Sequence, residues 1–290
     1  MTIAQSTSLP DDCTPVLVSE RKRHTSDFQD AWPLSPSASN VYEFSPEELV
    51  DKALKALQEA GIQLIEWKTL LYRRMGVPVI LKDFHYLVPD EQLPLASKVL
   101  EEDQGLPRSI PPSLLLSTGG EIYSKATLYR VTRYTSPARA QHLVLYPSSF
   151  PSFAPSELEL QPRITSDPSP LCTEVLVPTP PAVYASIIRM MQSWTHYDAT
   201  RMTLESDLSE LIGSRMNGLC RRVRGHGGRG AVQRPPGRLE VGNAARVVEE
   251  WRDTHQFREE ERWIADALVH VVSGEWSVED IPWADPLHRL

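Results

Sequence analysis

The sequence contains few cysteines and no long hydrophobic run. Its three cysteines, Cys13, Cys172 and Cys220, stand far apart, and none belongs to a CxxC pair or lies at metal-ligand spacing from a histidine. This pattern excludes a disulfide framework and a zinc site of the usual spacing. The polar N-terminal residues lack the apolar stretch of a signal peptide, and no apolar run reaches membrane-spanning length. We therefore expect an intracellular protein, cytoplasmic or nuclear, without a membrane partner.

The motifs of several enzyme classes are also missing. The chain contains no GxSxG, HRD or DFG motif, and its eight histidines are dispersed. These absences argue against a nucleophile triad and against a protein kinase. Residues 117–121 read STGGE, but no lysine follows at P-loop spacing, so the pattern favours a plain turn over a phosphate-binding loop.

Proline is abundant and charge is unevenly distributed. The 290 residues include 25 prolines, and 41% of the residues are hydrophobic, which predicts extended loops around a real core. The net charge of −8 argues against a surface built as a whole for nucleic acid. Residues 214–238, however, carry seven arginines and no acid, so the remainder of the chain has a charge of −8 less 7, or −15.

The patterning predicts three regions. Residues 1–40 show no sustained periodicity and are expected to form a disordered tail. Residues 41–177 mix helical and strand signals, as in an α/β core, and residues 178–290 form a helical subdomain that contains the basic Arg/Gly loop at 214–238. The expected fold class is α+β or a small mixed-sheet α/β fold.

Local signals predict individual elements. Ser45 and Glu48 form a capping box for a helix that ends at Gly61, while Asp90 and Asn243 are expected to cap two later helices. Further helices are predicted over 66–75 and from about 180, 204 and 263 onward. Strands are predicted over 77–81, 84–88, 127–134, 142–146 and 172–177. The last of these lies within a proline-rich stretch at 147–181, which is otherwise expected to be loop.

Residues 70–93, LLYRRMGVPVILKDFHYLVPDEQL, resemble the nucleotidyltransferase fold. The match uses the Gly-Val-Pro at 76–78, Asp83, the Val-Pro-Asp-Glu at 88–91 and Leu93. In that family two carboxylates at i and i+2 of a strand point to one face and hold Mg²⁺ during attack on the α-phosphate. The resemblance implies that Asp83 and His85 occupy the catalytic positions and that Asp83 is the metal ligand.

The sequence departs from the family pattern where the chemistry lies. His85 stands at the second carboxylate position, and imidazole is a poor ligand for Mg²⁺. Lys68 and Thr69 replace the family's glycine turn, and the candidate third strand, 141–146, has no carboxylate. We therefore expect a nucleotidyltransferase-like core that is not an enzyme and has no cofactor. Residual activity would be metal-dependent nucleotidyl transfer, with Mg²⁺ bound only if the degenerate site still accepts it.

Two longer runs, LVLYPSS at 143–149 and TLESDLSELI at 203–212, belong to a wider likeness. The chain as a whole is similar to uncharacterised proteins of mushroom-forming fungi. That likeness implies no function by itself. An accessory role in a fungal biosynthetic gene cluster is one alternative hypothesis.

The basic segment is a second candidate for function. It resembles RGG-type RNA-binding tracts, and a nucleic-acid partner would be bound through Arg221, Arg222, Arg224 and Arg229. Residues 214–238 contain no aromatic side chain to stack on bases. Two other interpretations stay open: a solvated loop between helices, and an out-of-frame or mis-spliced stretch of the gene.

Overall fold

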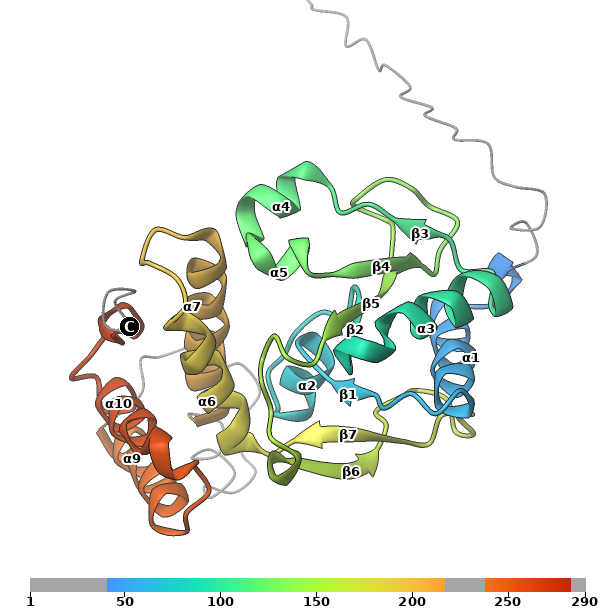
Figure 1. The fold of residues 1–290 in the computed structure, drawn as a ribbon. Coiled ribbons are helices and arrows are strands. Elements are labelled where there is room, and N and C mark those ends of the chain that lie inside the picture. The colour runs from blue at the N-terminus through green and yellow to red at the C-terminus, as the bar shows by residue number, and fades with distance from the viewer. Residues whose placement is uncertain (1–40, 217–237, 283–290) are drawn as a thin grey trace, which may run out of the picture. The chain divides into compact units, whose positions relative to one another are not determined.

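The computed structural model describes residues 41–216 and 238–282, which belong to one packed unit, Ser35–Leu290. Within these residues, a seven-stranded mixed sheet has the order β3-β4-β5-β2-β1-β7-β6 (Figure 1). The mixed α/β class expected from the sequence is confirmed. The predicted tail at 1–40 and most of the basic loop, 217–237, lie outside the described residues.

Strand β2 is the fourth of the seven strands and pairs on both sides. It runs parallel to β5, with Phe84 opposite Leu143, and antiparallel to β1. The strands are β1 (Ile65–Glu66), β2 (Phe84–Val88), β3 (Arg108–Ser109), β4 (Thr127–Arg130), β5 (His142–Pro147), β6 (Leu158–Pro162) and β7 (Glu174–Pro178).

Helices pack against this sheet and against one another. Figure 1 shows α6 beside α7 and α9 beside α10, in agreement with the contacts between these pairs. The helices are α1 (Pro46–Glu59), α2 (Thr69–Arg74), α3 (Leu93–Lys98), α4 (Ser113–Gly119), α5 (Glu121–Ser124), α6 (Pro180–Met191), α7 (Ala199–Leu211), α9 (Arg238–Asp253) and α10 (Arg262–Ser273).

The first helix follows its sequence signals closely. The Glu48 N–H donates to the Ser45 hydroxyl, and the Glu48 carboxylate accepts from the Ser45 N–H, so the capping box is confirmed. Gly61 follows the helix with φ +76°, a left-handed conformation that glycine adopts at low cost. The buried residues of α1, among them Val50, Leu54 and Leu57, then face the core.

Two predictions around β2 were wrong. The helix expected over 66–75 begins only at Thr69, because Ile65 and Glu66 pair with β2 as strand β1. Residues 77–81 are not a strand. Pro78 has no N–H to donate, and Ile80 is 90% exposed.

Two predicted helix caps were also wrong. The Asp90 carboxylate caps no helix but accepts hydrogen bonds from the backbone N–H and hydroxyl of Ser149. Asn243 lies inside α9, which begins at Arg238. In the proline-rich stretch, β6 pairs with β7 as an additional edge strand. Its five residues include two Leu and one Pro, which carry little strand signal in the sequence.

A buried ion pair fastens the β6–β7 connection to α1. One oxygen of Asp51 on α1 lies 2.6 Å from Nη2 of Arg163, and both side chains are about 95% buried. The same carboxylate accepts the backbone N–H groups of Leu171, at 2.7 Å, and Cys172, at 3.2 Å. Residues 163–172 are therefore held to the core by one carboxylate that makes three hydrogen bonds.

We expect Asp51→Ala to lower the free energy of unfolding by about 3–5 kcal/mol, since it leaves the Arg163 guanidinium buried without its partner. Urea denaturation measures the change. The control is Glu59→Ala, which breaks the exposed Lys55–Glu59 pair and should cost less than about 1 kcal/mol. Equal costs in the two variants would show that the Asp51 pair does not anchor the connection.

Candidate functional site

The structure places Asp83 immediately before the central strand β2, beside the start of β5. The backbone N–H of His142 donates to Asp83 Oδ1 at 2.8 Å, and His142 Nδ1 lies 3.1 Å from the same oxygen. Burial raises the pKa of the Asp83 carboxyl, but the hydrogen bonds and the nearby imidazoles outweigh it, so the pKa lies below its ordinary value. Asp83 is therefore a carboxylate whose Oδ1 is engaged by the neighbouring strand.

His85 lies on the same face of β2, two residues further on. Its Nδ1 is 3.3 Å from the Tyr146 hydroxyl of β5, and the two rings stack with an interplanar angle of 22°. Burial lowers the pKa of His85 to about 4; Asp83 opposes the shift, and the neighbouring Lys68 and His142 add to it. His85 is thus a neutral imidazole at physiological pH.

Lys68 stands at the turn before α2, where the resemblance expects glycine. Its backbone has φ 53° and ψ −127°, nearly the same angles as Gly120, with φ 55° and ψ −132°. A side chain in such a conformation costs about 1–3 kcal/mol unless the surroundings hold it. Lys68 is held: its Nζ lies 2.5 Å from Asp207 Oδ2 on α7.

Asp207 also accepts a hydrogen bond from the Tyr72 hydroxyl of α2, at 3.0 Å. Burial raises the pKa of Tyr72 well above its ordinary value, and the negative charge of Asp207 raises it further. The pKa of Tyr146 is raised in the same way, by burial first and by nearby tyrosine and carboxylates second. We call this group of side chains the polar cluster: Lys68, Tyr72, Asp83, His85, His142, Tyr146 and Asp207.

The polar cluster does not fit the Mg²⁺ that the resemblance implies. Within residues 41–216 and 238–282, no three His, Cys, Asp or Glu side chains are grouped so that they could hold a metal ion. The residue two positions after Asp83 is a neutral imidazole, and the facing position on β5 is another imidazole, whereas Mg²⁺ prefers oxygen ligands. The side chains around Asp83 therefore do not provide the oxygen ligands that Mg²⁺ prefers.

Sequence reasoning found Asp83 and His85, and the structure brings them together on one face. Sequence reasoning missed Tyr72, His142, Tyr146 and Asp207. Asp207 carried a readable signal: it lies three residues after Leu204 and four before Leu211, on the apolar stripe of α7, where a charged side chain needs a partner.

Two further sequence expectations concern residues away from the cluster. Cys172 is buried, and burial raises the pKa of its thiol to about 11, which agrees with the absence of a nucleophile triad at this residue. The arginines proposed to bind nucleic acid, 221, 222, 224 and 229, lie outside the described residues. Their role stays a prediction.

Asp207→Asn should lower the free energy of unfolding by roughly 2–4 kcal/mol, because it leaves the Lys68 ammonium largely buried without a counter-charge. Adding Lys68→Gly should recover much of this loss, since glycine relieves the backbone strain and removes the unpaired charge. Chemical denaturation of Asp207→Asn and of the double variant measures both changes in stability. A double variant less stable than Asp207→Asn alone would contradict a strained Lys68 backbone.

Between about pH 6.5 and pH 4 the unfolded chain protonates His85 and the folded chain does not, so stability should fall as the pH is lowered across this window. The contribution is roughly 1–3 kcal/mol, and His85→Gln should remove it. The control is His255→Asn, at an exposed residue whose left-handed backbone asparagine accepts. Denaturation midpoints are measured against pH in the native chain, in His85→Gln and in His255→Asn. The same slope in all three would refute a buried neutral His85.

Compared with known proteins, the chain matches no family model, and neither a curated protein nor a solved structure shows significant similarity to it. The likeness to nucleotidyltransferases and to fungal proteins therefore stays a prediction. Among the described helices, none is both long enough and apolar enough to cross a membrane.

Proposed function

We propose that this chain is a nucleotidyltransferase-like protein that has lost nucleotidyl transfer and acts as a binding or scaffold protein. The observation that carries the proposal is Lys68. A lysine occupies the turn where the resemblance calls for glycine, its backbone keeps the positive φ that glycine adopts freely, and its ammonium is bound by Asp207. A protein that keeps the fold but has lost the chemistry would retain the backbone conformation of this turn without retaining its glycine.

The order of elements around Lys68 supports the same proposal. The turn leads into α2, Gly76 ends that helix with φ +88°, and the chain then reaches β2 with Asp83 and His85 at its start. Strand β5, which the resemblance would require to bear a third carboxylate, lies directly beside β2. The parts of the family pattern thus meet at one end of β2.

The side chains at that end support the loss of catalysis. Asp83 is engaged by His142, and the second position is the neutral His85. The Lys68 side chain lies against α7 and is about 90% buried, so its ion pair with Asp207 closes the turn that would have to receive a phosphate. The cluster satisfies its polar groups internally, which stabilises a fold but leaves little to stabilise a reacting nucleotide.

Calorimetric titration with ATP and with Mg²⁺ or Mn²⁺, together with a labelled-nucleotide transfer assay, tests this function. We expect neither transfer nor metal-dependent nucleotide binding. His85→Asp, which places a second carboxylate on the face of Asp83, should introduce Mn²⁺ binding that a further Asp83→Asn abolishes.

The matched control is Asp90→Asn, an exposed carboxylate just past the other end of β2. Metal-dependent transfer by the native chain that is lost in Asp83→Asn and kept in Asp90→Asn would establish an enzyme and overturn the loss of catalysis. Failure of His85→Asp to bind Mn²⁺ would count against the nucleotidyltransferase-like arrangement.

A further inference from the structure

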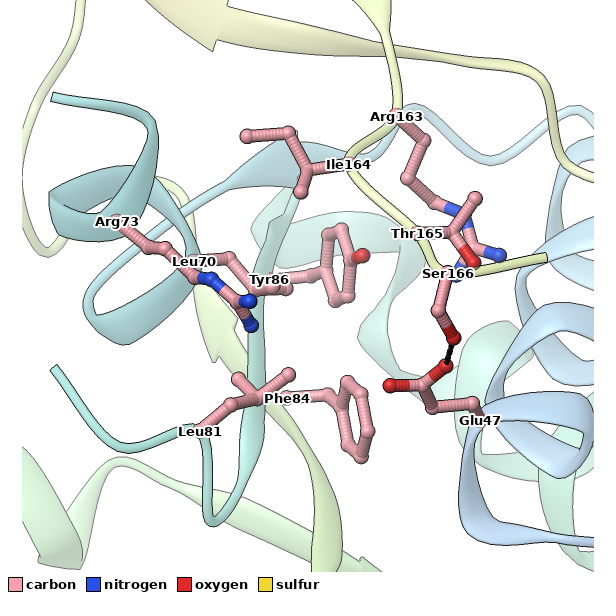
Figure 2. Close-up of a pocket in the computed structure, with 10 residues that line it drawn as sticks. All are labelled: Glu47, Leu70, Arg73, Leu81, Phe84, Tyr86, Arg163, Ile164, Thr165 and Ser166. Atoms are coloured by element: carbon pink, nitrogen blue, oxygen red, sulfur yellow. Dashed lines mark hydrogen bonds between the residues drawn. The ribbon is translucent and has the colours of Figure 1, made fainter. Parts of the chain in front are cut away.

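Buried charge beside β2 is paired, as at the pocket shown in Figure 2. This pocket has a volume of about 130 Å³, and the Arg163 side chain lies at its wall together with Tyr86. Oδ1 of Asp51 lies 2.6 Å from Nη2 of Arg163 and holds the guanidinium in the core. Unpaired positive charge is found instead at the surface, in the loop of residues 131–141 that joins β4 to β5.

This loop belongs to a segment with almost no acidic residues. Between Gln104 and Ser156 the sequence contains a single Asp or Glu, Glu121, and its carboxylate lies 3.6 Å from the Lys125 ammonium. The same segment carries four arginines, at positions 108, 130, 133 and 139. In a chain of net charge −8, this segment is therefore a local excess of positive charge, which attracts anions.

Two of these arginines are held against one aromatic ring. The guanidinium carbons of Arg133 and Arg139 each lie 5.5 Å from the centre of the Tyr134 ring. A side-chain hydrogen bond from Arg133 and the positive charges of both arginines lower the pKa of Tyr134. Among the residues that the structure describes, neither guanidinium forms an ion pair with a carboxylate. The loop thus gathers two cations around one tyrosine and supplies no anion for them.

Ser136, in the same loop, is a residue that could carry such an anion. It is exposed, as are all residues from 133 to 139, and its hydroxyl forms no hydrogen bond with a described residue. Its carbonyl accepts the Arg139 N–H at 3.0 Å, so a turn brings Arg139 back toward it. The Lys82 ammonium donates to the carbonyl of Pro137, the next residue, at 2.7 Å. A free serine hydroxyl therefore lies in cationic surroundings.

The sequence that begins at Ser136 is Ser-Pro-Ala-Arg. Proline-directed Ser/Thr kinases require proline directly after the acceptor residue, and many of them select a basic residue two positions beyond that proline. The chain has six Ser-Pro or Thr-Pro pairs, and Ser136 is the only acceptor among them with Lys or Arg at this position. A kinase can bind the loop without opening the core, because the residues around Ser136 are exposed and held by turn hydrogen bonds.

We propose that Ser136 is a phosphorylation site of a proline-directed kinase and that Arg133 and Arg139 bind its phosphate. The kinase transfers the γ-phosphoryl group of ATP. A bond forms between Ser136 Oγ and the γ-phosphorus, the bond from that phosphorus to the β–γ bridging oxygen breaks, ADP leaves, and the hydroxyl proton passes to the catalytic base of the kinase. The phosphate adds about −1.5 to −2 charges at pH 7 and three acceptor oxygens, which suit the forked guanidinium. The inference does not depend on the function proposed for the polar cluster.

The first test incubates the full chain with ATP and a cyclin-dependent kinase, which is proline-directed, and maps the phosphorylated peptides by mass spectrometry. We expect modification of Ser136, which Ser136→Ala abolishes. The matched control within the chain is Ser169, an exposed serine followed by Pro170, Leu171 and Cys172, with no basic residue. It should be modified about tenfold more slowly or not at all. No modification of Ser136, or equal rates at Ser136 and Ser169, would overturn the proposal.

A ³¹P NMR titration of the phosphorylated chain tests the role of the arginines. Arg133→Gln should raise the second pKa of the phosphate by about 0.3–0.7, toward the value of about 6 for free phosphoserine, because it removes one exposed counter-charge. The control is Arg108→Gln, at an exposed arginine on β3 outside the loop, and it should leave this pKa unchanged. The same pKa in the native chain and in both variants would show that the arginines of the loop do not bind the phosphate.

Discussion

The pairing of β2 with β1 and β5 is the constraint on which the rest of the structure depends. As the central strand of seven, β2 has no edge and must be covered on both faces. Side chains alternate along a strand, so one face receives Asp83 and His85 and the other receives Phe84 and Tyr86. A shift of register by one residue would exchange the two sets and place Asp83 and His85 on the face that now receives Phe84 and Tyr86.

Each face solves the problem of buried polar groups differently. On the His85 face the groups partner one another: Asp83 with His142, His85 with Tyr146, and Lys68 with Asp207. Such a satisfied network stabilises one arrangement of side chains, because losing any member would leave a partner unpaired in a region of low dielectric.

On the Tyr86 face one carboxylate provides the pairing. Asp51 satisfies Arg163 and two backbone N–H groups of the β6–β7 connection. A buried ion pair of this kind needs such additional hydrogen bonds, because they offset the cost of taking its charges out of water. The two faces of one strand therefore bury polar groups in different ways, one through a network of several side chains and the other through a single ion pair.

The sequence by itself determined the mixed α/β class, the first helix with its capping box and the strand over 84–88. These depend on local signals such as capping residues, a glycine after a helix and a run of apolar, aromatic and β-branched residues, which are read from neighbouring residues. It could not determine that Asp90 binds Ser149 instead of capping a helix, or that Ile65 and Glu66 form a strand, because both depend on partners distant in the chain.

Only the tertiary structure decided which groups meet at β2. Asp207 is 139 residues from Lys68, and His142 is 59 residues from Asp83. Contacts over such separations are created by packing between elements and leave little trace in local patterning, apart from a charged residue on an apolar stripe.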